Sequence, residues 1–227
     1  MSFNLILPYF VTKGRNKKEF IKSMPEVYRF SVDKLIEDVK EAKSLGIKSI
    51  LLFGVSKEKD ERGTSAYSKT GIVQKALTAI KKEIKDITVI TDVCLCAYTS
   101  HGHCGILKRK NKVIFDKDKT RKILAKIALS HAEAGADFVA PSAMMDGQVK
   151  AIRKALDKNG YSKVKILAYS AKYASYFYGP FREALDSSPR FGNRRNYQLD
   201  SRNSAAALRE IRQDIKEGAD VVMVKPA

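Results

Sequence analysis

Short β-branched runs alternate with amphipathic stretches along almost the whole chain of 227 residues. Six runs are predicted as strands: Leu5–Val11, Ser49–Phe53, Thr88–Thr91, Phe138–Ala140, Lys165–Tyr169 and Val221–Val224. Five stretches between them are predicted as helices: Val32–Leu45, Ile72–Ile84, Lys119–Ala134, Val149–Lys158 and Ser204–Glu217. The strands are apolar nearly throughout, which is typical of strands covered on both faces. The alternation therefore predicts an α/β domain on a parallel sheet.

The positions of the polar residues favour a barrel over an open sheet. Asp92, Cys94, Ser142, Lys172 and Lys225 each follow a predicted strand. In a (β/α)8 TIM barrel such positions converge on one face, where the active site forms. No Gly-x-Gly-x-x-Gly follows the first strand, so a dinucleotide fold has no support. Because six strands do not close an eight-stranded barrel, we expect a single, incomplete barrel domain over residues 1–227, with about six βα units.

Three cysteines, Cys94, Cys96 and Cys104, fall within eleven residues. An odd number so closely grouped argues against a disulfide framework and for a reducing compartment. Cys94 and Cys96 lie two apart at a strand end, so their side chains can share a face. Three thiolates and a water make a catalytic type of zinc site, which His101 and His103 could complete or surround. The alternative is three buried, inert thiols beside two loop histidines.

Lys172 and Lys225 are single lysines that follow apolar runs on consecutive predicted strands. Burial and a second cation nearby both lower the pKa of a lysine. A neutral amine is the nucleophile that forms a Schiff base with a ketone. The alternative is that each lysine extends from a strand end to water.

The segment 178–198 is rich in Gly, Pro and Ser and carries Arg182, Arg194 and Arg195. It is predicted to be a mobile loop over the strand ends. Arginine pairs with carboxylates in bidentate geometry, so such a lid suits a substrate with a carboxylate tail. The alternative is a flexible loop with solvated charge. The residues alone thus predict a lysine-imine enzyme that acts on keto acids, with zinc as a candidate cofactor.

The formal net charge of +18, from 43 basic against 25 acidic residues, permits a different class of function. A basic protein that binds RNA or acidic surfaces is the alternative to an enzyme. The lysines are spread along the chain without interleaved aromatics, which favours a solvated surface that attracts small anionic substrates. No signal peptide or membrane span is visible. We therefore expect a cytoplasmic protein without a membrane or nucleic-acid partner.

Several segments together resemble the porphobilinogen synthase (5-aminolevulinate dehydratase) family. Asp92-Val-Cys-Leu-Cys-Ala-Tyr-Thr-Ser-His-Gly-His-Cys-Gly105 is similar to the family's zinc-type metal loop. Tyr169-Ser-Ala-Lys-Tyr-Ala-Ser175, Phe177-Tyr-Gly-Pro-Phe-Arg182 and Gly218-Ala-Asp-Val-Val-Met-Val-Lys-Pro226 are similar to its two catalytic-lysine regions. Ser23-Met24-Pro25 and Lys59-Asp60-Glu61-Arg62-Gly63 also match, so the resemblance covers essentially the whole chain.

The resemblance implies the condensation of two 5-aminolevulinate molecules to porphobilinogen, with loss of two waters, in tetrapyrrole and heme biosynthesis. It implies that Lys225 holds the first substrate as a Schiff base and that Lys172 holds or activates the second. The remaining implied roles are zinc binding by Cys94, Cys96 and Cys104, binding of the second substrate's carboxylate by Arg182, Arg194 and Gln198, and an allosteric magnesium at Glu210. A homo-oligomer is expected, since the family forms octamers. A class I aldolase-like enzyme, the other lysine-imine reading, is disfavoured by the three-cysteine loop.

The chain departs from the family pattern in four respects. Ala143 replaces the first carboxylate of an Asp-Met-Met-Asp-Gly motif, which would alter proton transfer near the site. Asn196 stands where some members have a further cysteine, which disfavours a second zinc. We expect most of the N-terminal arm and the last two βα units to be lacking. Those units supply contacts to the first substrate's carboxylate, so an inactive fragment is a further alternative.

Overall fold

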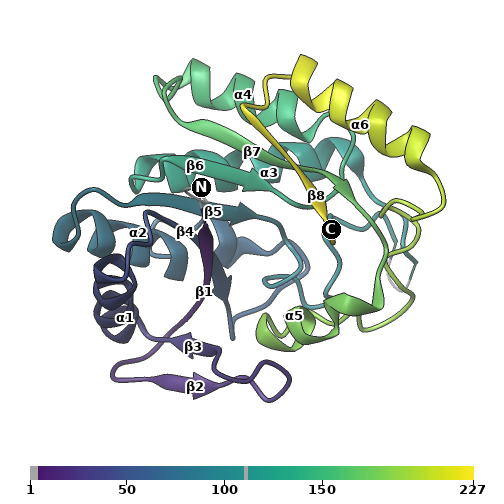
Figure 1. Cartoon of the computed structure of the whole chain (residues 1–227). Helices are drawn as coiled ribbons and strands as arrows, with labels where there is room; N and C mark the ends of the chain where they lie inside the picture. Colours follow the sequence, from purple (N-terminus) through teal and green to yellow (C-terminus); the bar gives the residue numbers. More distant parts are fainter. Residues whose placement is uncertain (1–4, 110–111) are drawn as a thin grey trace.

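The computed structural model describes residues 5–109 and 112–227 and confirms the α/β fold with a parallel sheet. The six predicted strands are β1 (Ile6–Thr12), β4 (Ser49–Val55), β5 (Thr88–Val93), β6 (Phe138–Pro141), β7 (Lys165–Lys172) and β8 (Val221–Lys225). They pair in parallel in chain order, and β1 and β4 are in register from Ile6↔Ser49 to Thr12↔Val55. Figure 1 shows that these strands form a curved sheet.

A hairpin that was not predicted extends the sheet beside β1. It consists of β2 (Lys18–Phe20) and β3 (Tyr28–Phe30), which are antiparallel to each other, while β3 runs parallel to β1. Three-residue strands that carry charged side chains are too short to produce a clear alternation of polar and apolar residues. In the part of the chain that is described, the strand order is β2-β3-β1-β4-β5-β6-β7-β8, so β8 and β2 are the two edges of the sheet.

The helices follow the strands much as predicted. They are α1 (Val32–Ser44), α2 (Ile72–Glu83), α3 (Lys117–Glu133), α4 (Gln148–Lys158), α5 (Gly179–Ala184) and α6 (Ser204–Lys216), with short 3-10 turns at Thr64–Tyr67 and Tyr176–Tyr178. In α1 the residues Leu35, Ile36, Val39 and Ala42 are buried, as their helical spacing predicts. Asp116 is the N-cap of α3, and its carboxylate accepts a hydrogen bond from the Lys119 backbone N–H. None of the described helices is both long enough and apolar enough to cross a membrane.

Five of the helices cover one face of the curved sheet, and α5 lies apart from them at the strand ends (Figure 1). α5 falls inside the segment 178–198 that was predicted to be a loop, so that segment is partly helical. Pro180 in its first turn is compatible with a helix start, because the N–H that proline lacks has no partner there in any case. The carboxyl ends of the six parallel strands therefore face α5 and the segment that follows it.

Candidate functional site

The two candidate lysines are neighbours across a strand pair. Lys172 ends β7, Lys225 ends β8, and the two are register partners. The Lys172 ammonium donates a hydrogen bond to the Ser142 carbonyl at 2.8 Å. The two Nζ atoms lie 5.5 and 5.4 Å from the ring centroid of Tyr169, so both amines face one aromatic ring. The structure thus brings together the two lysines that the sequence singled out.

Lys225 lies in surroundings that favour its neutral form. Its Nζ is 4.2 Å from the ring centroid of Phe181 on α5 and 5.9 Å from that of Tyr178. Burial, and then the charge of Lys172, lower the pKa of Lys225 to about 8, whereas the charge of Asp92 opposes the shift. An amine with this pKa is partly neutral near pH 7 and is a competent nucleophile.

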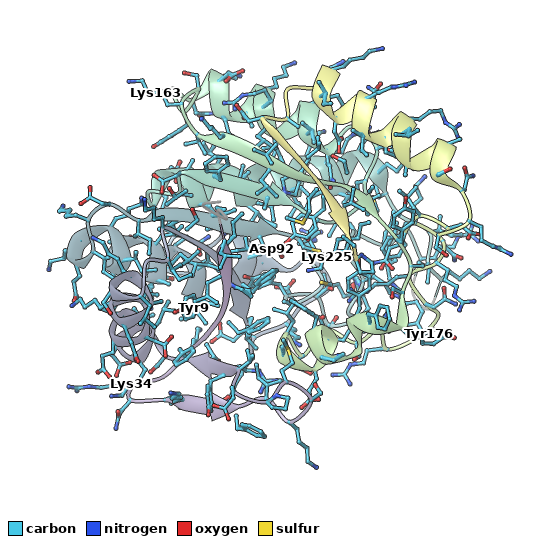
Figure 2. The ribbon with its side chains drawn as sticks, in the orientation of Figure 1. Tyr9, Lys34, Asp92, Lys163, Tyr176 and Lys225 are labelled. Atoms are coloured by element: carbon cyan, nitrogen blue, oxygen red, sulfur yellow. The ribbon has the colours of Figure 1, made fainter. Side chains whose placement is uncertain are left out.

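Asp92, near the end of β5, interacts electrostatically with both lysines. Figure 2 shows Asp92 and Lys225 near the centre of the molecule, whereas Tyr176 lies at its periphery. Burial raises the pKa of Asp92 to about 6, against the opposing effects of its hydrogen bond and of the lysine charges. The Ser142 hydroxyl donates that hydrogen bond, at 2.6 Å. A carboxyl group with this pKa can both accept and return a proton near neutral pH.

The three cysteines form a buried cluster next to the lysines. Their Sγ atoms lie within 4.8 Å of one another, and those of Cys94 and Cys96 are 3.5 Å apart. Hydrogen bonds from Cys94 and Cys96 hold the pKa of the Cys104 thiol well below its usual range, and the same contact raises the pKa of Cys94. The three sulfurs are therefore close enough together to hold one metal ion.

The two loop histidines lie beside the sulfurs rather than among them. His103 Nδ1 is 3.2 Å from the Tyr197 hydroxyl, which also lies 3.7 Å from Cys104 Sγ. His103 Nε2 is 2.9 Å from the Phe191 carbonyl and donates to it, which leaves Nδ1 as an acceptor. His101 Nδ1 accepts a hydrogen bond from the His103 backbone N–H at 3.1 Å. Both rings thus support the loop, and Tyr197, which the sequence did not single out, connects that loop to the arginine segment.

Two of the three predicted carboxylate-binding residues face the lysines. Arg182 and Arg194 line a narrow cavity of about 40 Å³ together with Asp92, Lys172 and Lys225. The Nε atoms of both arginines are buried without a hydrogen-bond partner among the described residues. Burial, and then the charge of Arg194, lower the pKa of Arg182. The cavity is thus lined by one buried and one half-buried guanidinium group, and guanidinium groups are well suited to pair with a carboxylate.

Gln198 and Glu210 lie in a different cavity. It has a volume of about 430 Å³ and is lined by both residues and by Asp146, Asp214 and Glu217. Burial and the neighbouring charge of Asp146 raise the pKa of Glu210. The structure therefore does not bring Gln198 into the lysine cavity with the two arginines.

A larger cavity lies on the outer side of the cysteine loop, next to His101 and Phe191. It has a volume of about 1060 Å³, lies along α3, and is lined by basic residues that include Lys119, Lys122 and Lys126. It lacks both candidate lysines, the cysteines and Asp92, so we place the candidate site at the smaller cavity. The aromatic residues Tyr169, Tyr178 and Phe181 complete that site. They lie in the segments that resemble the family's catalytic-lysine regions, but the sequence assigned none of them a role.

Almost the entire chain matches known proteins. A family model described as "Delta-aminolevulinic acid dehydratase" matches residues 1–227. The proteins of that name from Methanothermus sociabilis and Bacillus subtilis are 59% and 49% identical over 224 residues, which are 99% of this chain and 69% and 68% of theirs. The crystal structure of delta-aminolevulinic acid dehydratase (porphobilinogen synthase) from Toxoplasma gondii ME49, in complex with the reaction product porphobilinogen, superposes with a TM-score of 0.93 at 43% identity.

That superposition covers 99% of this chain and 64% of the Toxoplasma chain, so the chain spans about two thirds of the length of the relatives it matches. The curved sheet is thus the same arrangement that the Toxoplasma enzyme contains. By sequence and by fold, the chain belongs to the delta-aminolevulinic acid dehydratase family.

Proposed function

We propose that this protein condenses two molecules of 5-aminolevulinate to porphobilinogen, in tetrapyrrole and heme biosynthesis. The observation that carries the proposal is the pair of lysine amines at the ends of β7 and β8, with the pKa of Lys225 lowered to about 8. Family membership supports it, as does the porphobilinogen bound in the Toxoplasma relative.

Lys225 is the proposed nucleophile. Its neutral amine attacks the ketone carbon of the first substrate, and loss of one water leaves an imine between Lys225 and that carbon. Asp92, whose pKa of about 6 suits proton exchange near neutral pH, takes up and returns the protons of these steps. Lys172 lowers the proton affinity of Lys225 and, held by the Ser142 carbonyl, faces the second substrate.

The arginines are proposed to hold the carboxylate of the second substrate. Both side chains line the cavity, and their Nε–H groups are buried without partners among the described residues, so a carboxylate that reached both would satisfy them. Gln198 was also predicted to bind this carboxylate, and it would have to act from the neighbouring cavity, where Glu210 is the proposed magnesium ligand. The overall positive charge would attract the anionic substrate.

Zinc fits the three-cysteine cluster. A tetrahedral zinc with Zn–S bonds of ~2.3 Å places its sulfurs ~3.8 Å apart. The observed 3.5 Å between Cys94 and Cys96 and the 4.8 Å limit for all three agree with that value. Cys94, Cys96 and Cys104 would hold the ion and leave one position for a water or a substrate oxygen. A bound zinc would supply a Lewis acid that polarises a carbonyl. We further propose a cytoplasmic homo-oligomer.

Reductive trapping tests the proposal. The chain is incubated with 5-aminolevulinate and borohydride, digested, and mapped by mass spectrometry. We expect the Lys225 peptide to gain the mass of the substrate less one oxygen atom, because imine formation loses water and reduction adds two hydrogens. Lys225→Met should abolish the label, whereas Lys163→Met, at an exposed lysine far from the site (Figure 2), should not. A folded, unlabelled wild-type chain would refute the imine at Lys225, and labelling without porphobilinogen would identify an inactive fragment.

A further inference from the structure

We propose that Arg29, on the β2–β3 hairpin, is a positioning residue for the reactive lysine: it fixes α5 so that Phe181 covers the Lys225 amine. The inference rests on the proposed role of Lys225. It links a hairpin to which the sequence gave no part in the lysine chemistry to the nucleophile at the opposite edge of the sheet.

Arg29 binds the end of α5 through two hydrogen bonds. Its Nε donates to the Ala184 carbonyl at 2.7 Å, and its Nη2 donates to the Glu183 carbonyl. The last carbonyls of a helix have no partner within the helix, and a cation there also interacts favourably with the helix dipole. Glu19, the register partner of Arg29 on β2, has its carboxylate 4.0 Å from Arg29 Nη1 and holds the guanidinium from the other side.

Two further polar contacts attach α5 and the residues just after it to this side of the molecule. The Lys22 backbone N–H donates to the Glu183 carboxylate at 3.1 Å, and Lys59 pairs with Asp186 at 2.6 Å just after the helix. A cavity of about 550 Å³, lined in part by Arg29, Glu183 and Asp186, lies along α5. Ala184 and Leu185 are buried in the core at the carboxyl end of this six-residue helix, and the polar contacts of Arg29 fix that same end against the hairpin.

Phe181 transmits this position to the site. Its ring packs edge-on against Phe10, at 5.9 Å between centroids, and against Phe53, at 6.2 Å. Phe10 is the register partner of Arg29 on β1, so the cation and the ring hold α5 from adjacent positions. The same Phe181 ring lies 4.2 Å from Lys225 Nζ.

The effect of this cover on Lys225 has a definite sign. An aromatic face attracts an ammonium ion, but less strongly than the water that it displaces. Burial is accordingly the largest cause of the lowered pKa of Lys225. If α5 moves away, water reaches Nζ, and it also screens the repulsion by Lys172. Both changes favour the protonated, unreactive amine.

The test measures the titration of the Lys225 amine without substrate, so its result does not depend on the condensation activity. The chain is labelled with limiting acetic anhydride from pH 6 to pH 11, and the Lys225 peptide is quantified by mass spectrometry. Arg29→Gln should move the midpoint up by ~1 unit, a loss of about tenfold in amine reactivity at pH 7. Arg29→Lys, which keeps the charge but lacks the planar fork that reaches both carbonyls, should give a smaller upward shift.

The matched control is Arg153→Gln. Arg153 also donates to two backbone carbonyls, those of Val164 at 2.8 Å and Tyr161 at 3.2 Å, but these lie before β7, at the opposite end of the strands from the lysines. This variant should lose stability and keep the wild-type midpoint. A midpoint in folded Arg29→Gln equal to that of Arg153→Gln would overturn the proposal. If Arg29→Gln does not fold, an unshifted midpoint in Arg29→Lys would do the same. A wild-type midpoint near 10.5 would instead refute the role of Lys225 itself.

Discussion

The rate of imine formation should follow the titration of a single perturbed amine. The pKa of Lys225 is about 8, against the ordinary 10.5, so about 3 kcal/mol disfavours its ammonium form. At pH 7 about one amine in ten is then neutral, which is ~300-fold more than for an ordinary lysine. The trapping rate with 5-aminolevulinate should therefore rise about tenfold per pH unit below pH 8 and become constant above it.

Replacing Lys172 with Met separates the two causes of the lowered pKa. The substitution removes the neighbouring charge and keeps most of the burial. Because burial is the largest cause, the midpoint should rise but stay below the ordinary 10.5. Lys40→Met removes an equal charge at an exposed ion pair with Glu83 and should leave the midpoint unchanged.

The assay is the initial rate of cyanoborohydride trapping at the Lys225 peptide between pH 6 and pH 10.5. The midpoint is the quantity compared, since Lys172→Met is also expected to slow later steps. A wild-type rate that still increases tenfold per unit at pH 10 would refute the reasoning, because the amine would then be an ordinary one. A midpoint that falls in Lys172→Met would show that the two ammonium groups do not repel each other.

Three further perturbations test other parts of the site and the core. Cys96→Ser should weaken zinc binding by ~100-fold or more in a chelator competition, and unchanged affinity would exclude a three-thiolate site. Asp92→Asn should stabilise the fold above pH 6. Because the pKa of Asp92 is raised to about 6, the folded wild-type protein binds this proton more tightly than the unfolded chain does. The wild type therefore loses stability as the pH rises from about 4 to about 6, and the Asn variant does not. Urea unfolding at pH 8 should show a gain of ~1–2 kcal/mol that disappears near pH 4, and an equal gain at both pH values would contradict this origin. Leu124→Ala, at a fully buried position of α3, should reduce the free energy of unfolding by ~2–5 kcal/mol, and a loss below ~1 kcal/mol would mean that the cavity collapses.

The sequence predicted the parallel sheet and the convergence of the reactive residues because each depends on local periodicity. Asp92, Cys94, Lys172 and Lys225 were placed together because each follows a strand, and parallel strands bring such positions to one end. Arg182 and Arg194 were placed near them because they belong to a segment that follows β7.

Contacts between distant segments could not be predicted in this way. Arg29 lies in no recognisable local pattern, and the motif that contains Phe181 gives that ring no role, because its contacts depend on where α5 packs after the chain has folded. Gln198 was assigned by resemblance alone, and its place beside Glu210 reflects the turn that leads into α6. The pKa values of Lys225 and Asp92 likewise depend on burial, which composition and spacing do not specify.

The two edges of the sheet differ in a way that matters for handling the protein. β2 is three residues long and carries Lys18 and Glu19, which discourage the approach of another backbone. Among the described strands, β8 pairs with β7 alone, and it exposes Val221 and Val224. Such an edge can template a foreign strand, so concentrated solutions of this 227-residue chain should scatter light progressively as copies add there. A charged side chain in place of Val224 is the substitution that should suppress this scattering.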